Sequence, residues 1–152
     1  VKYQSSSRQD MAEFGAETVN FNSPAGGNIQ ALLVDDVAMN LKVLQAMLKK
    51  MNVSCILAES AEEALELLRK GRRADIILTD LWMPGMNGGE LAERLAGDPV
   101  LREIPVIAVT ADSQIDPKLE GLFDGVLLKP ISLDGLRKLL NGLPVKRTAI
   151  DC

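Results

Sequence analysis

Four apolar runs in this 152-residue chain each end at a polar side chain that can bind a metal ion or a phosphate group. Asp35 and Asp36 follow the first run, and Asp80, Thr110 and Lys129 follow the other three. The runs are residues 32–34, 76–79, 106–109 and 126–128. Short apolar runs separated by helix-length segments predict buried parallel strands, and ligands bind beyond the carboxyl ends of such strands. We therefore expect three carboxylates, a hydroxyl and an ammonium group at one edge of a sheet.

Asp35, Asp36 and Asp80 would repel one another if they met without a cation. Two unit charges about 4 Å apart repel by roughly 4 kcal/mol at an effective dielectric constant near 20. The chain has no histidine, and an oxygen-only ligand set favours a hard cation. Mg²⁺ fits better than Ca²⁺, because it keeps several waters and commonly shares its coordination with phosphate. Thr110 and Lys129 would then face the phosphate oxygens that the metal leaves free.

Each of these residues has a simpler explanation when it is taken alone. Asp35 and Asp36 are good N-cap residues for the helix that follows them. Thr110 could merely end a strand, and Lys129 could be a solvated surface lysine. Their shared position at four strand ends favours a functional site over these separate explanations.

Strand and helix signals alternate about five times from residue 29 onward. Leu41, Leu44, Leu48 and Met51 recur at helical spacing, and Ser60 with a glutamate three residues later is typical of a capping box. Helices are expected over residues 38–50, 60–71, 90–95, 116–120 and 133–140, with a further strand over 55–58. This alternation predicts an α/β fold of five strand–helix units with helices on both faces of a parallel sheet.

Composition narrows the function classes. A net charge of −4 and a pI near 4.9, without a dense basic run, argue against direct nucleic-acid binding. Cys55 and Cys152 have no disulfide-framework spacing, which is typical of a reducing, cytoplasmic environment. No apolar stretch reaches the roughly 20 residues that span a bilayer, so we expect no membrane contact by this segment. The absence of histidine excludes Ser-His-Asp catalysis and a phosphohistidine donor on this chain.

The motifs Val34-Asp35-Asp36, Asp80-Leu81-Trp82-Met83-Pro84, Thr110-Ala111 and Lys129-Pro130 resemble those of a response-regulator receiver domain of two-component signalling. The resemblance covers roughly residues 29–143 and preserves the order of the motifs. It implies a flavodoxin-like, CheY-like fold, which is a doubly wound five-stranded parallel sheet with strand order 2-1-3-4-5.

The resemblance also implies a role for each motif. Asp80 would accept a phosphoryl group from a phosphohistidine on a histidine kinase or a histidine phosphotransfer domain. Asp35, Asp36, Asp80 and the backbone carbonyl of Trp82 would hold Mg²⁺. The Trp82 ring would shield the acyl phosphate from water, unless it is simply an exposed loop aromatic.

The remaining motif residues would contact the phosphoryl oxygens through the Thr110 hydroxyl, the Ala111 amide and the Lys129 ammonium group. Phosphoryl transfer depends mainly on positioning and charge neutralisation. The domain would therefore catalyse its own phosphorylation and dephosphorylation without being a separate enzyme, although the parent chain could be a histidine kinase.

The flanking segments suggest a larger parent protein. Residues 1–28 are expected to be a tail or linker, and the stretch from Gly15 resembles the last strand of a histidine-kinase ATPase domain. Residues 144–152 are expected to be a C-terminal tail. A receiver from a hybrid sensor histidine kinase that is anchored in the inner membrane is the preferred interpretation, and a stand-alone receiver is the next.

Two departures from the family pattern leave alternatives open. Val126 occupies the position where an aromatic switch residue is usual, and Asp116-Pro117 predicts a short fourth helix on the face where such domains often dimerise. A homodimer is therefore possible, as is a pseudo-receiver that only binds proteins. An aspartate-based phosphatase is disfavoured because Trp82 cannot supply a second acid. A flavin-binding domain is disfavoured because the acidic edge would repel the flavin phosphate.

Overall fold

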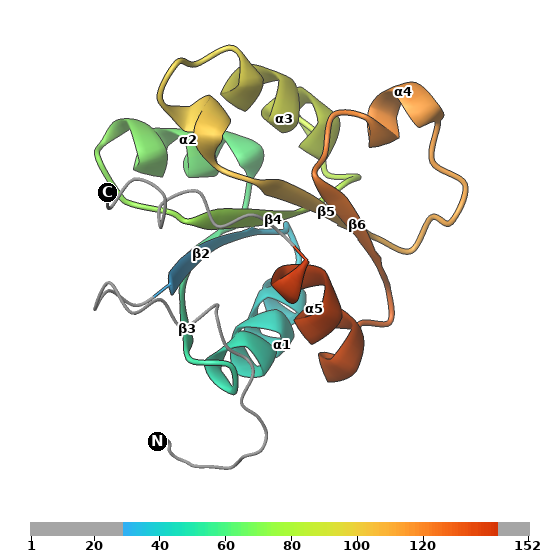
Figure 1. Ribbon diagram of the computed structural model, residues 1–152. Helices are drawn as coiled ribbons and strands as arrows, with labels where there is room; N and C mark the ends of the chain where they lie inside the picture. Colours follow the sequence, from blue (N-terminus) through green and yellow to red (C-terminus); the bar gives the residue numbers. More distant parts are fainter. Residues whose placement is uncertain (1–28, 143–152) are drawn as a thin grey trace.

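A five-stranded parallel sheet organises the protein (Figure 1). The computed structural model describes residues 29–142, so the predicted tails at 1–28 and 144–152 lie outside the described residues. The sheet order is β3-β2-β4-β5-β6. The strands are β2 (Ile29–Val34), β3 (Val53–Ala58), β4 (Ile76–Asp80), β5 (Val106–Thr110) and β6 (Gly125–Leu128). Counted along the described chain, this is the order 2-1-3-4-5, so the predicted CheY-like topology is confirmed.

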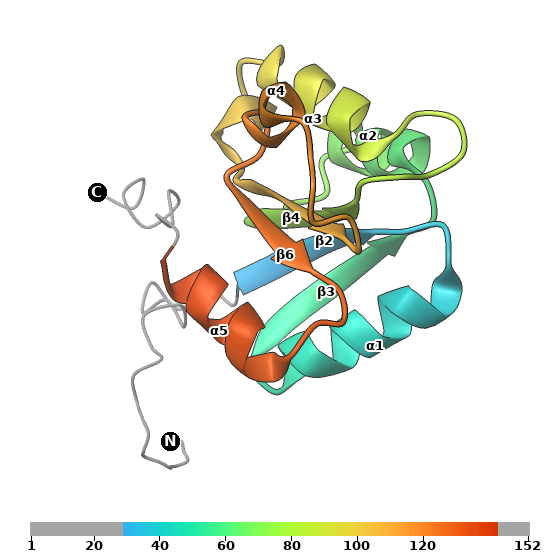
Figure 2. The ribbon, with the colours of Figure 1, turned by 90° about the vertical axis from the view of Figure 1, so that its right-hand side faces the viewer.

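Helices cover both faces of the sheet (Figures 1 and 2). α1 (Ala38–Lys49) and α5 (Leu133–Asn141) lie on one face, and α2 (Ala61–Arg69) and α3 (Gly88–Ala96) lie on the other. α4 (Pro117–Glu120) has only four residues, as the Asp116-Pro117 pair predicts. The structure adds a 3₁₀ helix, η2 (Leu101–Glu103), that the sequence analysis did not predict.

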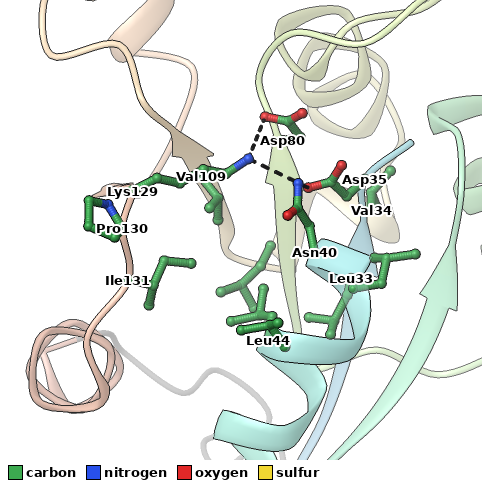
Figure 3. Close-up of a pocket in the computed structure, with 13 residues that line it drawn as sticks. Leu33, Val34, Asp35, Asn40, Leu44, Asp80, Val109, Lys129, Pro130 and Ile131 are labelled. Carbon is green, nitrogen blue, oxygen red and sulfur yellow. Dashed lines mark hydrogen bonds and ion pairs between the residues drawn. The ribbon is translucent and has the colours of Figure 1, made fainter. Parts of the chain in front are cut away.

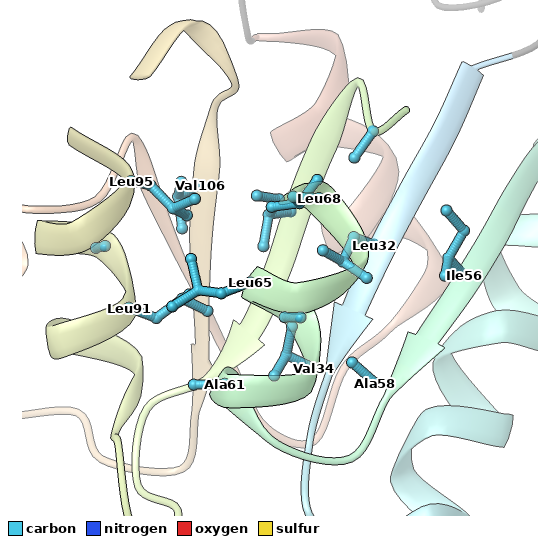
Figure 4. Close-up of a cluster of buried hydrophobic side chains, with 14 of the residues drawn as sticks. Leu32, Val34, Ile56, Ala58, Ala61, Leu65, Leu68, Leu91, Leu95 and Val106 are labelled. Atoms are coloured by element: carbon cyan, nitrogen blue, oxygen red, sulfur yellow. The ribbon is translucent and has the colours of Figure 1, made fainter. Parts of the chain in front are cut away.

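Each face of the sheet has its own apolar core. Leu41, Leu44 and Leu48 of α1 are buried against one face, whereas Met51 lies beyond the end of the helix and is only half-buried. On the other face, Leu65 of α2 and Leu91 of α3 belong to the same cluster of buried side chains (Figure 4). Fully burying a leucine contributes about 1.5–3 kcal/mol relative to leaving it exposed. These two cores hold the helices against the strands that carry the polar strand-end residues.

The starts of α2 and α3 differ from the sequence-based prediction. At α2, the Ser60 hydroxyl accepts a hydrogen bond from the Glu63 amide, but the Glu63 carboxylate accepts from the Glu59 amide and not from Ser60. The reciprocal capping box lies instead at α3, where Asn87 and Glu90 each accept a hydrogen bond from the other's backbone amide. This cap starts α3 at Gly88, two residues before the predicted start.

Gly88 packs directly against the backbone at the end of β4. A Cβ atom at this position would lie 2.5 Å from the Asp80 carbonyl oxygen and 3.1 Å from the Leu81 Cα. Neither backbone atom can rotate away, so we expect Gly88→Ala to lower the free energy of unfolding by about 2–3 kcal/mol, as in overpacked interiors. Urea denaturation measures this loss. Gly97→Ala is the matched control, because its Cβ would meet its nearest atoms at an ordinary 3.7 Å; equal stability of the two variants would contradict the prediction.

Within residues 29–142, no helix is long and apolar enough to cross a bilayer.

Candidate functional site

The sheet register brings the polar strand-end residues to one edge. Val34, the residue before Asp35, pairs with Thr79, the residue before Asp80. Asp80 in turn pairs with Val109 of β5. Because all five strands are parallel, the residues that follow them meet at the carboxyl edge of the sheet.

Asp35 is buried and its carboxylate is oriented by two local donors. The residue as a whole is 6% exposed. The Val37 amide donates a hydrogen bond to Oδ1 over 2.9 Å, and the Asn40 side-chain amide of α1 donates one to Oδ2 over 3.1 Å. Burying a carboxylate without partners is strongly unfavourable. These hydrogen bonds therefore explain how Asp35 can hold a fixed position inside the site.

Lys129 bridges two of the carboxylates (Figure 3). Its ammonium nitrogen lies 3.7 Å from Asp35 Oδ2 and 3.6 Å from Asp80 Oδ1. The Lys129 backbone amide also donates a hydrogen bond to the Thr110 carbonyl over 2.8 Å, which extends the sheet pairing beyond β6. The Lys129-Pro130 peptide bond that follows is cis. The Lys129 ammonium group therefore reaches the acidic carboxyl edge of the sheet from the end of β6, the outermost strand on the side opposite β3.

Asp35, Asp36 and Asp80 form a set that fits a cation. One carboxylate oxygen from each lies within 4.8 Å of the other two. Asp35 is buried, Asp80 is half-buried and Asp36 is exposed, so one side of the set faces solvent. Three carboxylates and no nitrogen or sulfur ligand suit Mg²⁺, which keeps water in its remaining positions. The donor set therefore fits the metal that the family resemblance implies.

The pKa of the Asp80 carboxyl group lies above its ordinary value of 3.8. Burial is the largest cause, because it disfavours the charged form, and repulsion from Asp35 comes next. The Lys129 ammonium group and a hydrogen bond from the Leu81 amide act in the opposite direction, and Asp36 adds a further small repulsion. Ionisation of Asp80 therefore costs free energy in this arrangement, and a bound cation would lower that cost.

This raised pKa predicts that Asp80→Asn stabilises the metal-free domain at pH 7. The folded domain binds the Asp80 proton more tightly than the unfolded chain, so ionisation costs stability. The cost is absent below pH 3.8, grows as the pH rises through the folded-state pKa, and is complete above it.

Urea denaturation without Mg²⁺ should show a higher midpoint for the variant at pH 7 and a shrinking difference toward pH 4. Glu66→Gln, at an exposed position on α2, should show no such pH-dependent gain; equal midpoints at pH 7 for Asp80→Asn and wild type would contradict the prediction.

Thr110 and Ala111 lie at the same edge, but their side chains differ in exposure. Thr110 is 1% exposed, and its hydroxyl accepts a hydrogen bond from the Asp112 amide over 3.1 Å. That hydroxyl still has a proton to donate. Ala111 is exposed at the start of the loop that leads to α4. Val126 lies on β6 opposite Ala108 and is half-buried.

Trp82 follows β4 on an exposed loop. The residue is 55% exposed, which agrees with the alternative of an exposed loop aromatic. Trp82 is the single tryptophan of the chain and lies two residues after Asp80. Its fluorescence is therefore a local probe for events at the acidic edge.

An apolar cavity of about 250 Å³ adjoins the ion pairs (Figure 3). It lies between α1 and the segment after β6, and Asp35, Asn40, Asp80 and Lys129 supply its polar groups. Its apolar lining is Leu33, Val34, Leu41, Val43, Leu44, Leu78, Val109, Pro130 and Ile131. Apolar walls lower the local dielectric constant, which strengthens both the attraction of Lys129 and the repulsion between the carboxylates.

Sequence reasoning did not assign a role at the site to Asn40, Asn87 or Gly88. Asn40 lies five residues after Asp35 and Asn87 lies three before Glu90, so spacing alone could have suggested a carboxylate partner and a helix cap. Gly88 gave no such signal, because its role depends on the close approach of two backbone segments.

Comparison with known proteins identifies the family. Residues 31–141 match the family profile of the response regulator receiver domain. The sensor histidine kinase AruS of Pseudomonas aeruginosa is 40% identical over 130 residues, which are 81% of this chain and 13% of that protein. The two-component response regulator ORR6 of Oryza sativa subsp. japonica is 34% identical over 120 residues, which are 76% of this chain and 71% of that protein.

Solved structures agree with this relationship. The receiver domain of sensor histidine kinase PA1611 from Pseudomonas aeruginosa PAO1, with a magnesium ion coordinated in its active-site cleft, is 25% identical with a TM-score of 0.68. The match covers 76% of this chain and 96% of that domain. A CheY-like receiver domain from Methylobacillus flagellatus has a TM-score of 0.70 at 25% identity, over 76% of this chain and 98% of that one. The chain therefore belongs to the response regulator receiver domain family of two-component signalling.

Proposed function

We propose that this receiver domain accepts a phosphoryl group on Asp80 in a Mg²⁺-dependent step of a two-component phosphorelay. The observation that carries the proposal is the position of Asp80, which lies beside two further carboxylates and 3.6 Å from the Lys129 ammonium group. A nucleophilic carboxylate beside a metal-ligand set and a fixed cation is suited to in-line phosphoryl transfer, which needs charge neutralisation more than proton transfer.

In the proposed reaction, an Asp80 carboxylate oxygen attacks the phosphorus of a phosphohistidine on a partner. The bond between phosphorus and the imidazole nitrogen breaks, the electron pair leaves with the imidazole, and an acyl phosphate forms on Asp80. Lys129, the Thr110 hydroxyl and the Ala111 amide would bind the phosphoryl oxygens. Attack by water on the same phosphorus would break its bond to the Asp80 oxygen, release inorganic phosphate and restore the free carboxylate, so the domain would also catalyse its own dephosphorylation.

The metal would be held by Asp35, Asp36, Asp80 and the backbone carbonyl of Trp82. When bound, Mg²⁺ supplies positive charge that offsets the negative charge of the phosphoryl oxygens. The nearness of the three carboxylates and the raised pKa of Asp80 support this assignment, because a cation stabilises the ionised carboxylate that acts as the nucleophile.

The partner would be a histidine kinase or a histidine phosphotransfer domain in the cytoplasm. The chain spans 13% of AruS and 13% of the sensor histidine kinase RcsC of Salmonella typhi. These coverages support a receiver module within a larger hybrid kinase. In this proposal the module is bounded at about residues 29 and 143, and the parent kinase is anchored in the membrane. Residues 1–28 would then connect the receiver to a preceding kinase domain. A homodimer through the α4 face is a further part of the proposal.

Transfer from a phosphohistidine donor tests the proposal. The purified domain is mixed with a phosphorylated histidine phosphotransfer domain, and label on both proteins is followed with and without Mg²⁺. We expect loss of label from the donor and gain on the receiver only with Mg²⁺. Retention of label on several competent donors would favour the pseudo-receiver, for which the half-buried Val126 at the usual aromatic position is the supporting observation.

A further inference from the structure

The loop between β4 and α3, residues 81–87, carries the Trp82 carbonyl that the proposed metal site uses. Its two ends are fixed. The Leu81 carbonyl accepts a hydrogen bond from the Gly88 amide over 2.9 Å, and Asn87 forms the capping box with Glu90. Met83 is buried in the core below the loop. The segment around Gly85 and Met86 must be held in place by other contacts.

Glu62 of α2 contacts this segment. Its Oε2 accepts a hydrogen bond from the Met86 amide over 3.2 Å. A Cβ atom on Gly85 would lie 3.2 Å from the same oxygen, so the carboxylate sits directly against the loop backbone. Gly85 has a φ of +75°, a conformation that glycine adopts without strain. The close approach and the left-handed turn together present the Met86 amide to Glu62.

The helix that carries Glu62 is anchored in the protein core by its buried face. Ala61, Ala64, Leu65 and Leu68 of α2 are buried in the core shared with α3 (Figure 4). Glu62 is itself exposed, so its carboxylate has no role in the core and its contact is with the loop. A hydrogen bond from the Met86 amide of the loop to a carboxylate on this helix limits the conformations of the loop.

We infer that Glu62 is a positioning residue for the metal site, because its carboxylate holds the β4–α3 loop, which carries the Trp82 carbonyl that the proposed site uses, in one conformation. This role rests on the proposed function. It acts through the hydrogen bond to Met86 and not through the charge of Glu62. The loop is then already ordered before the metal binds, so the entropy cost of ordering it does not reduce the Mg²⁺ affinity.

Mg²⁺ titration of the whole chain, followed by Trp82 fluorescence, tests this role. We expect Glu62→Ala to weaken Mg²⁺ binding about fivefold, the effect of losing one exposed hydrogen bond. Glu62→Gln keeps an oxygen acceptor but loses the charge, so it should remain within about twofold of wild type. Glu66→Ala removes a charge from an exposed position one turn further along α2 and should also stay within about twofold.

Amide hydrogen exchange at Met86 in the metal-free protein provides a second readout. Exchange should be about tenfold faster in Glu62→Ala than in wild type, and close to wild type in Glu62→Gln. Unchanged Mg²⁺ affinity in Glu62→Ala, or equal losses in the Ala and Gln variants, would overturn the positioning role and leave the proposed function standing. Failure of the wild-type protein to bind Mg²⁺ at millimolar concentration would overturn the proposed function, and the positioning role with it.

Discussion

Asp80→Asn is expected to abolish phosphoryl incorporation from both small-molecule and phosphohistidine donors. The amide of asparagine is a poor nucleophile and cannot form the acyl phosphate that a carboxylate forms. The substitution is nearly isosteric, and it also removes the repulsion between positions 80 and 35. The variant should therefore be folded and, without metal, more stable than wild type.

Peptide mapping of the reaction products measures this effect. Wild type should carry its phosphoryl group on the peptide that contains Asp80, and the variant should carry none above background. Asp134→Asn, which changes an exposed carboxylate in the first turn of α5, is the control and should be phosphorylated normally. Stable phosphorylation of Asp80→Asn to the wild-type level would contradict the assignment of Asp80 as the acceptor.

Asp35→Asn is expected to weaken Mg²⁺ binding by roughly 100-fold. A unit charge about 4 Å from a cation contributes several kcal/mol at an effective dielectric constant near 20, and relief of the repulsion with Asp80 offsets part of the loss. The substitution also turns an acceptor into a donor where the Asn40 amide and the Lys129 ammonium group both need an acceptor. Two mechanisms, lost charge and lost orientation, therefore lower the affinity together.

Trp82 fluorescence titration measures the Mg²⁺ affinity of this variant. Asp134→Asn serves again as the control and should bind within about twofold of wild type, because its carboxylate lies on the exposed surface of α5. Wild-type Mg²⁺ affinity in Asp35→Asn would show that Asp35 is not a metal ligand.

The fold could be predicted from the sequence because local and long-range signals agree. The apolar runs at β2, β4 and β5 are continuous, as buried parallel strands require, and the Leu41, Leu44 and Leu48 spacing fits one helix face. The 3₁₀ helix at Leu101–Glu103 was missed, since a single turn gives no periodicity. The capping box was predicted at Ser60, whose hydroxyl does accept from Glu63, but the reciprocal partner depends on backbone geometry that the spacing does not determine.

The candidate site was only partly accessible to sequence reasoning. The strand-end positions of Asp35, Asp80 and Lys129 follow from the parallel topology, so their meeting at one edge could be expected. The contact of Glu62 with Met86 joins residues 24 positions apart, and the approach of Gly88 to Asp80 joins two backbone segments. Contacts of this kind depend on how the helices pack across the sheet, which one sequence without structure does not reveal.

The proposed role of Asp80 as a Mg²⁺-dependent phosphoacceptor is tested most directly by intact-mass analysis of the wild-type protein after incubation with acetyl phosphate, with and without Mg²⁺. We expect a mass gain of one phosphoryl group that requires Mg²⁺ and is lost in base, as an acyl phosphate should be. A mass unchanged under all conditions, or a base-stable gain that forms equally well without Mg²⁺, would contradict that role.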